Sequence, residues 1–148
     1  MSTQNTEIIK NVNFGKIEVN ESQKLFFPFG LFGFEDYKEY YLVDVNISPF
    51  LLLQEKSDEN IGFIVCDPFL FFSDYEFDLD ENTMKVIDAK SQDDILILTI
   101  ITLSDKMEEI TTNLLGPLVI NRKNHVGIQY IINSDKYTTK HKLFLNKK

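Results

Sequence analysis

The chain is organised around one stretch, which reads Phe63-Ile-Val-Cys-Asp-Pro-Phe-Leu-Phe-Phe-Ser-Asp-Tyr-Glu-Phe-Asp-Leu-Asp80. It begins with an apolar run, breaks at Asp67-Pro68, and ends in a regular alternation of acidic and apolar residues. The acidic residues of this alternation are Asp74, Glu76, Asp78 and Asp80, and the apolar ones are Tyr75, Phe77 and Leu79. Because successive side chains of a β-strand point to opposite faces, the spacing predicts a strand with one charged face and one face toward the core.

Four like charges on one strand face repel each other, since neighbouring side chains on that face lie roughly 7 Å apart. Two interpretations remain open. In the first, the four carboxylates form a solvated edge of the sheet, and salt screens their repulsion over about 8 Å at physiological ionic strength. In the second, they form a binding surface for a basic partner. A calcium loop starting at Asp74 is not supported, because Leu79 stands where that loop needs Gly and Lys85 where it needs Glu.

Apolar runs separated by turn residues recur along the chain. With 148 residues, 43% of them apolar, the chain is long enough to bury the core of one domain, which we place at residues 1–148. Thirteen Phe and six Tyr without Trp favour strands over helices. Strands are predicted at residues 14–19, 24–27, 40–43, 50–54, 61–66, 95–103, 118–120 and 126–132, and short helical segments at 35–39 and 81–89.

These elements predict an all-β domain that is barrel-like or sandwich-like, mostly antiparallel, and has one or two short helices. Residues 95–103 are apolar on both faces, so we expect their strand to lie centrally in the sheet, buried on two sides. Residues 118–120 and 126–132 flank a polar turn and are predicted to form a hairpin.

The charge is unevenly distributed along the chain. The formal net charge is −8, yet residues 134–148 carry five Lys against one Asp, or +4, which leaves −12 for residues 1–133. A domain that negative repels phosphate, so we expect a basic protein partner and no direct binding of nucleic acid. Residues 1–6 and about 138–148 are polar or Lys-rich termini that we expect to be flexible.

The start of the sequence does not have the basic and apolar segments of a secretory signal, and no apolar stretch reaches the ~20 residues that span a bilayer. We therefore expect a cytoplasmic protein that does not contact a membrane. The single cysteine, Cys66, excludes an intramolecular disulfide, and its apolar neighbours predict that it is a small buried side chain.

Candidate catalytic and metal-binding residues are few. The histidines His125 and His141 have no His or Cys neighbour at ligand spacing, so a zinc site is not predicted. Cys66 has no base near it in the sequence, and nothing distinguishes the carboxylate pair Asp67 and Asp74 from ordinary acidic surface pairs. We predict that the protein is not an enzyme, and we assign no catalytic, cofactor-binding or metal-binding residue.

A second candidate region is the aromatic loop, residues 29–35, which reads Phe-Gly-Leu-Phe-Gly-Phe-Glu. Its glycines are not followed by the Gly-Lys-Ser/Thr ending of a phosphate loop, and acidic residues come next. The apolar side chains either close one end of the core or serve as exposed anchors for a protein partner. On the second interpretation the anchors are Phe32, Phe34 and Tyr75.

Five segments, taken together and in order, carry a family resemblance over roughly residues 14–132. They are Gly30-Leu-Phe-Gly-Phe-Glu35, Pro49-Phe-Leu-Leu-Leu-Gln54, Phe63-Ile-Val-Cys-Asp-Pro68, Asp74-Tyr-Glu76 and Asn113-Leu-Leu-Gly-Pro-Leu-Val-Ile-Asn121. This combination resembles the flagellar assembly factor FliW, a bacterial protein family. Two departures are visible, since Phe32 stands where the family usually has Pro and Gly116 where it usually has Ala.

The resemblance implies a non-enzymatic cytoplasmic β-protein with two protein partners, flagellin and the carbon storage regulator CsrA. CsrA is a basic RNA-binding dimer that represses flagellin translation. In the family's scheme FliW antagonises CsrA, and newly made flagellin takes FliW away, so that flagellin synthesis is matched to export.

We assign the partner-binding residues as hypotheses. The carboxylates of Asp74, Glu76, Asp78 and Asp80 are expected to face CsrA, and Phe32, Phe34 and Tyr75 to contact flagellin. We expect a monomer without a cofactor. The alternative function is that of a small-molecule-binding β-barrel, which would have a sizeable enclosed cavity with convergent polar groups.

Overall fold

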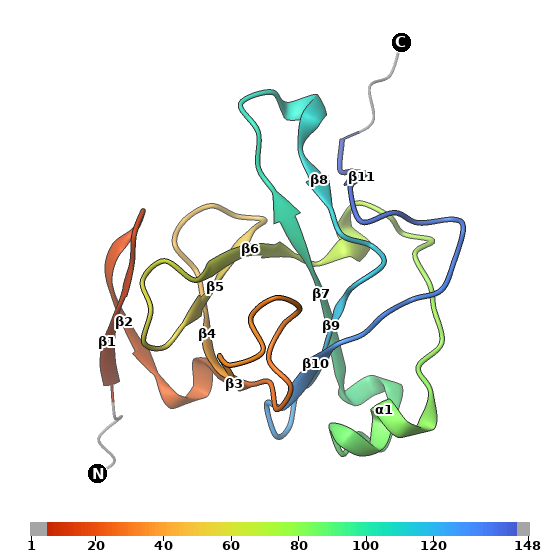
Figure 1. Cartoon of the computed structure of the whole chain (residues 1–148), viewed down its shortest axis with the longest axis horizontal. Coiled ribbons are helices and arrows are strands. Elements are labelled where there is room, and N and C mark those ends of the chain that lie inside the picture. The colour runs from red at the N-terminus through yellow and green to blue at the C-terminus, as the bar shows by residue number, and fades with distance from the viewer. Residues whose placement is uncertain (1–5, 145–148) are drawn as a thin grey trace.

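Antiparallel strands dominate the computed structural model, which describes residues 6–144 (Figure 1). The strands are β1 (Thr6–Asn11), β2 (Gly15–Asn20), β3 (Lys24–Phe26), β4 (Glu39–Val43), β5 (Leu51–Glu55), β6 (Gly62–Cys66), β7 (Ile95–Thr102), β8 (Thr111–Thr112), β9 (Leu118–Asn121), β10 (Gly127–Gln129) and β11 (His141–Lys142). One α-helix, α1 (Glu81–Val86), and the single-turn 3-10 helices η1 (Glu21–Gln23), η2 (Pro68–Leu70), η3 (Gln92–Asp94) and η4 (Met107–Glu109) connect them. The predicted all-β, mostly antiparallel fold is confirmed.

The main sheet closes on itself to give a barrel-like body. Its strand order is β10-β9-β7-β6-β5-β4-β3, and β8 and β11 extend it beside the end of β7. The two ends of the sheet meet at an isolated bridge between Phe26 and Val126, where the Phe26 N–H donates to the carbonyl of His125 at 2.9 Å. This contact leaves the ends of the sheet, β3 and β10, next to each other.

The interior of the barrel is filled by aromatic and branched aliphatic side chains. Phe27, Tyr40, Leu53, Val65 and Leu118 are fully buried there. The Phe27 and Tyr40 rings pack edge to face with centroids 5.6 Å apart, a favoured geometry for aromatic pairs. The many phenylalanines of the sequence therefore supply the packing volume of a narrow core.

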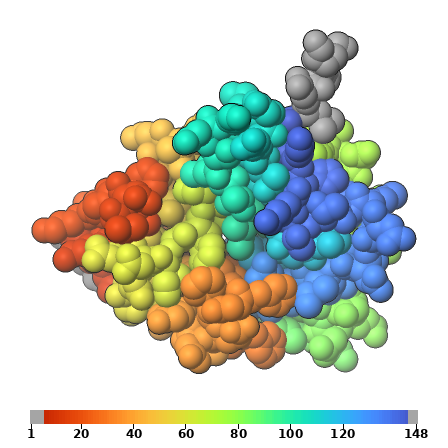
Figure 2. Space-filling model, turned by 45° about the horizontal axis from the view of Figure 1, so that its top comes forward, coloured from red at the N-terminus to blue at the C-terminus, as the bar shows by residue number. Residues whose placement is uncertain are grey.

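A hairpin of β1 and β2 covers the outer face of the sheet, and Figure 2 shows it projecting from one side of the body. Ile9 and Val19 of the hairpin pack against Tyr41 and Leu52, which point out of the barrel. Strand β5 is consequently buried on both faces, with Leu53 inside the barrel and Leu52 under the hairpin. Strand β1 was not predicted, because its only apolar residues, Ile8 and Ile9, are flanked by polar residues and do not alternate with them.

Buried amide groups fasten the hairpin to the barrel. The Asn11 side chain donates to Gln54 Oε1 at 2.6 Å, and Gln54 Nε2 donates to the carbonyl of Asp58 at 2.8 Å. Gly62 lies against this pair, since a Cβ at its position would be 2.6 Å from Gln54 Oε1 and 2.8 Å from Asn11 Nδ2. The close approach requires a residue without a side chain.

Several predicted elements differ from those observed. Helix α1 begins at the expected residue but ends at Val86. Residues 35–39 are not helical, since 35–36 form a turn and Glu39 is already the first residue of β4. Residues 138–144, expected to be flexible, include β11 and the buried Leu143. Thr6, the last residue of the N-terminus expected to be flexible, begins β1, and the remaining residues of both predicted flexible termini, 1–5 and 145–148, lie outside the described part of the chain.

Strand β7 is central, as predicted, because it pairs with β6, β8 and β9. The expectation that residues 95–103 are buried on two sides is wrong for Ile95, Leu96, Ile97 and Ile100, which are half-buried, and for Thr102 and Leu103, which are exposed. Cys66 is fully buried, as expected, and burial raises the pKa of its thiol to about 11. Within residues 6–144 none of the helices has the length and apolar character that crossing a membrane requires.

We predict that Gly62→Ala destabilises the fold by about 1–3 kcal/mol, because the added Cβ separates Asn11 from Gln54 and leaves buried amide groups unpaired. Gly116→Ala is the matched control. Its Cβ would meet Asn113 Nδ2 at 3.0 Å and Gln129 Nε2 at 3.1 Å, a smaller overlap than at Gly62, so we expect a change below about 1 kcal/mol. Urea unfolding of both variants checks this, and equal losses would contradict it.

Candidate partner-binding surface

The acidic segment, residues 74–80, belongs to no strand, and its first residue, Asp74, lies in a turn. It descends from the loop after β6 to the start of α1 along the right side of Figure 1. The predicted alternation is nevertheless observed, because Tyr75, Phe77 and Leu79 are buried or half-buried while the four carboxylates are exposed. The prediction of one charged and one apolar face is correct, and the prediction that the segment is a β-strand is wrong.

Tyrosine hydroxyls bind the backbone of the acidic segment in place of a neighbouring strand. The Tyr130 hydroxyl donates to the carbonyl of Asp78 at 3.0 Å, and the Tyr137 hydroxyl accepts from the Glu76 N–H at 3.2 Å. Backbone groups near a protein core need such partners. Both tyrosines follow β10 in the sequence, so residues distant along the chain fix the position of the acidic segment.

Tyr75 is the anchor of the acidic segment in the core. Its side chain is 3% exposed, its hydroxyl donates to the carbonyl of Leu114 at 2.6 Å, and burial raises its pKa far above the ordinary value. Its ring packs edge to face on Tyr137 with centroids 4.9 Å apart. The interpretation of Tyr75 as an exposed partner anchor is therefore wrong, because the ring and the hydroxyl are both used inside the protein.

The four carboxylates differ in their roles. Within residues 6–144 none of them forms a salt bridge. Asp80 is the N-cap of α1, since its carboxylate accepts from the Thr83 N–H at 2.8 Å, and hydrogen bonds from Thr83 lower its pKa. Asp74, Glu76 and Asp78 are exposed and point away from the core. These three are the carboxylates available to a partner.

An apolar groove of about 300 Å³ lies beside the acidic segment. It is lined by the apolar side chains Phe69, Tyr75, Phe77, Leu79, Ile95 and Ile97, with Glu76 and Gln92 as polar members. Phe69 belongs to η2 and is 43% exposed. The sequence did not predict this groove, because its walls come from three separate parts of the chain.

The aromatic loop combines the two roles that the sequence left open. Leu31 is buried, and Phe34 packs edge to face on Phe63 with centroids 5.2 Å apart, so these residues close the core. Phe32 and Phe29 are 49% and 62% exposed. Gly30 and Gly33 have φ values of +68° and +85°, which only glycine adopts readily, and they shape the loop.

Strand β10 and the residue after it connect the aromatic loop to the acidic segment. Gln129 Oε1 accepts from the Phe32 N–H at 2.9 Å, and the adjacent Tyr130 contacts the carbonyl of Asp78. The aromatic loop and the acidic segment therefore both form hydrogen bonds with the adjacent residues Gln129 and Tyr130. Phe32 is held by its backbone, which leaves its ring free at the surface.

Other candidate sites have different uses in the structure. Asp67 is the N-cap of η2 and accepts from the Phe69 N–H at 2.9 Å, so its carboxylate has a structural role. The ring of His141 packs on Phe72 with centroids 5.2 Å apart. Within residues 6–144 no group of three or more His, Cys, Asp or Glu could hold a metal ion.

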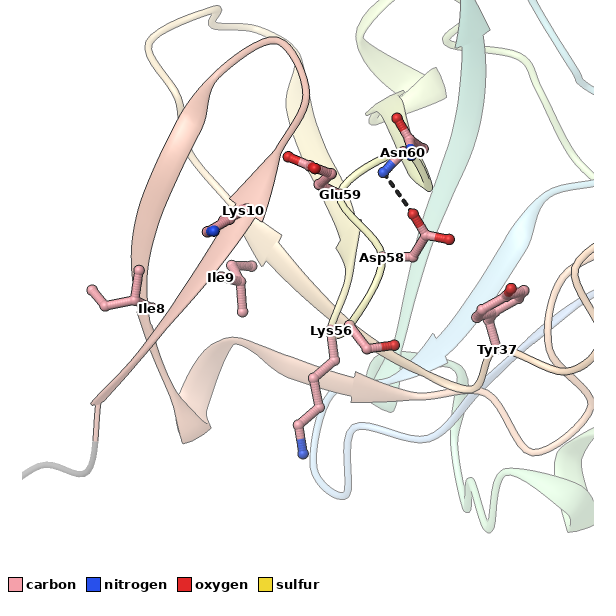
Figure 3. A pocket seen from close by; sticks show the side chains of 9 residues that line it. Ile8, Ile9, Lys10, Tyr37, Lys56, Asp58, Glu59 and Asn60 are labelled. Carbon is pink, nitrogen blue, oxygen red and sulfur yellow. Dashed lines mark hydrogen bonds between the residues drawn. The ribbon is translucent and has the colours of Figure 1, made fainter.

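A hollow of about 620 Å³ lies between the hairpin and the turn after β5 (Figure 3). Its polar side chains include Lys10, Lys56, Asp58 and Glu59. Figure 3 shows that these side chains point in different directions. A small-molecule site needs convergent polar groups, so this hollow does not have the arrangement that the alternative function requires.

Fold and surface together define a barrel-like β-protein that carries carboxylates and aromatic rings on its outside. The sequence model described as FliW protein matches residues 7–143. The flagellar assembly factors FliW of Treponema denticola and Bacillus subtilis are 41% and 39% identical to this chain, covering 90% of it and 90% and 94% of their own lengths. The chain belongs to the FliW family of flagellar assembly factors.

A solved structure agrees with this assignment. The crystal structure of a flagellar assembly factor FliW superposes with a TM-score of 0.88 at 34% sequence identity. The match covers 95% of this chain and 99% of that one. The similarity therefore extends over nearly the whole of both chains.

We predict that Tyr75→Phe lowers the free energy of unfolding by about 1–2 kcal/mol, because the buried carbonyl of Leu114 loses its donor. Tyr130→Phe removes a hydroxyl with an exposed bond to Asp78, where water can replace it, and should cost less than about 0.5 kcal/mol. Urea unfolding of the two variants measures the difference. A larger loss for Tyr130→Phe would contradict the role given to Tyr75.

Proposed function

We propose that this protein is a cytoplasmic monomer that binds flagellin and antagonises the translational regulator CsrA, so that flagellin synthesis follows export. Membership of the FliW family supports the flagellar role. The observation that carries the CsrA part is the acidic segment, which presents exposed carboxylates without cationic partners in the described chain. A basic RNA-binding protein is the natural complement of such a surface.

Antagonism of CsrA follows from electrostatics. Residues 1–133 of this protein carry a formal net charge of −12, so the bound protein brings negative potential close to the RNA-binding surface of CsrA. RNA phosphates are then repelled without their site being filled, because potentials of this kind act over about a Debye length, roughly 8 Å at physiological salt. The rigid anchoring by Tyr75 keeps the carboxylates on the outer face.

Flagellin is assigned to the aromatic loop. Exposed aromatic side chains often dominate protein interfaces, and Phe32 is half exposed on a loop whose backbone is fixed by Gln129. Phe34 contributes by holding the loop on Phe63. Tyr75 is not part of this assignment, because it is buried.

We expect that reversing Glu76 and Asp78 together to Lys slows association with CsrA about tenfold at low salt, because rim charges act mainly on the on-rate. The difference from the wild type should shrink at about 0.5 M salt, where charges are screened within a few ångströms. Stopped-flow or biosensor kinetics at several salt concentrations measure both effects. Asp80 is left intact because it caps α1.

The control for this variant is Glu18→Lys with Glu59→Lys, which changes the net charge by the same amount at two exposed positions on the hairpin side. Association of the control should slow much less, because its charges are not in the acidic segment. If both double variants slow equally, the total charge and not the acidic segment directs binding. If neither variant slows association, the CsrA assignment is wrong.

For flagellin we expect Phe32→Ala to weaken binding about tenfold while changing the free energy of unfolding by less than about 1 kcal/mol. Phe34→Ala should instead cost about 2 kcal/mol or more, since its ring packs on Phe63. Calorimetric titration with flagellin and urea unfolding separate the two effects. Unfolding by Phe32→Ala would show that this ring closes the core after all.

A further inference from the structure

The apolar groove has a floor on the outer face of β7. Ile95 and Ile97 point outward and line it, while Leu96 and Leu98 alternate with them and pack in the barrel core. Strand β6 pairs with β7 only from Thr99 onward. The first half of β7 therefore has no strand beside it on the β6 side, and the acidic segment covers that region only in part.

The walls of the groove are held apart by independent anchors. Phe77 and Leu79 belong to the acidic segment, whose backbone is fixed by hydroxyls from Tyr130 and Tyr137. Phe69 stands on η2, which is capped by Asp67. Each wall therefore has contacts of its own, and the groove between them is open in this structure.

The rim of the groove determines what could enter it. Glu76 lines the groove, Asp78 lies on the same outer edge of the acidic segment, and Asp93 follows the lining residue Gln92 in η3. All three carboxylates are exposed. These carboxylates would repel an acidic or phosphorylated ligand. An apolar group with cations beside it would instead pack on the isoleucines of the floor and pair with the carboxylates of the rim.

We propose that the apolar groove receives a single aliphatic side chain from a protein segment that carries Lys or Arg on both sides of it. The volume of about 300 Å³ is at the lower end for sites of drug-sized ligands, and it has room for an aliphatic side chain together with the backbone that carries it. The inference rests on the proposed function in one respect, that the partner of the acidic segment is basic. It adds the apolar anchor that the charges alone do not supply.

The test uses the full-length protein with methyl-labelled Ile and Leu, followed by NMR. The probe is a seven-residue peptide with one central Leu and three Lys on each side. It should shift the methyl signals of Leu79, Ile95 and Ile97 in a saturable way. Two control peptides replace the central Leu by Ser, or all Lys by Glu, and should leave these signals at least about tenfold less affected. Equal shifts with the Leu and Ser peptides would overturn the proposal.

Two variants of this protein test whether the groove contributes to CsrA binding. Leu79→Ser should weaken CsrA binding about tenfold through faster dissociation, because apolar anchors act on the off-rate. Leu103→Ser, at a 57% exposed position outside the groove, is the control and should have no effect. Urea unfolding of Leu79→Ser verifies that it folds.

The outcomes separate this inference from the proposed function. If the reversal of Glu76 and Asp78 weakens CsrA binding and Leu79→Ser does not, the groove proposal is wrong and the CsrA assignment stands. If CsrA does not bind at all but the Leu peptide shifts the groove methyl signals, the groove takes a basic apolar segment and the CsrA assignment is wrong.

Discussion

Closure of the main sheet between Phe26 and Val126 is the constraint on which the rest of the structure depends. An open sheet of these strands would leave β3 and β10 as unpaired edges, which attract other chains. Once the sheet closes, one face of β3, β4, β5, β6, β7 and β9 points into a narrow interior filled by Phe27, Tyr40 and Leu53. The outer faces then need covers of their own, because they also carry apolar residues.

Three parts of the chain supply these covers, and each is fixed by a different kind of contact. The hairpin of β1 and β2 lies over β4 and β5 and is fastened by buried amide groups. The end of the described chain packs Leu143 beside β7 and β8. The acidic segment lies along the first half of β7 and is fixed by tyrosine hydroxyls. The binding surfaces are therefore the outer sides of covering segments, while the barrel provides the support.

This arrangement explains how like charges are kept close together. The burial of Tyr75 and the packing of Phe77 in the same cluster hold the acidic segment in place, and these apolar contacts offset the repulsion among the exposed carboxylates. A disordered acidic segment would spread its charges and lower the local potential. Rigid anchoring concentrates the potential beside an apolar groove, so charge and shape act on the same partner.

Much of this follows from local pattern. The period of two in residues 74–80 determined which side chains face the core, and the apolar runs determined most strands of the barrel, because both depend on the direction of neighbouring side chains. Only the tertiary structure decided that the acidic segment pairs with tyrosines instead of a strand, that Tyr75 is buried, and that Phe69, Leu79 and Ile97 form one groove. Those contacts join residues that are far apart in the chain, and no local spacing in the sequence specifies which of them meet.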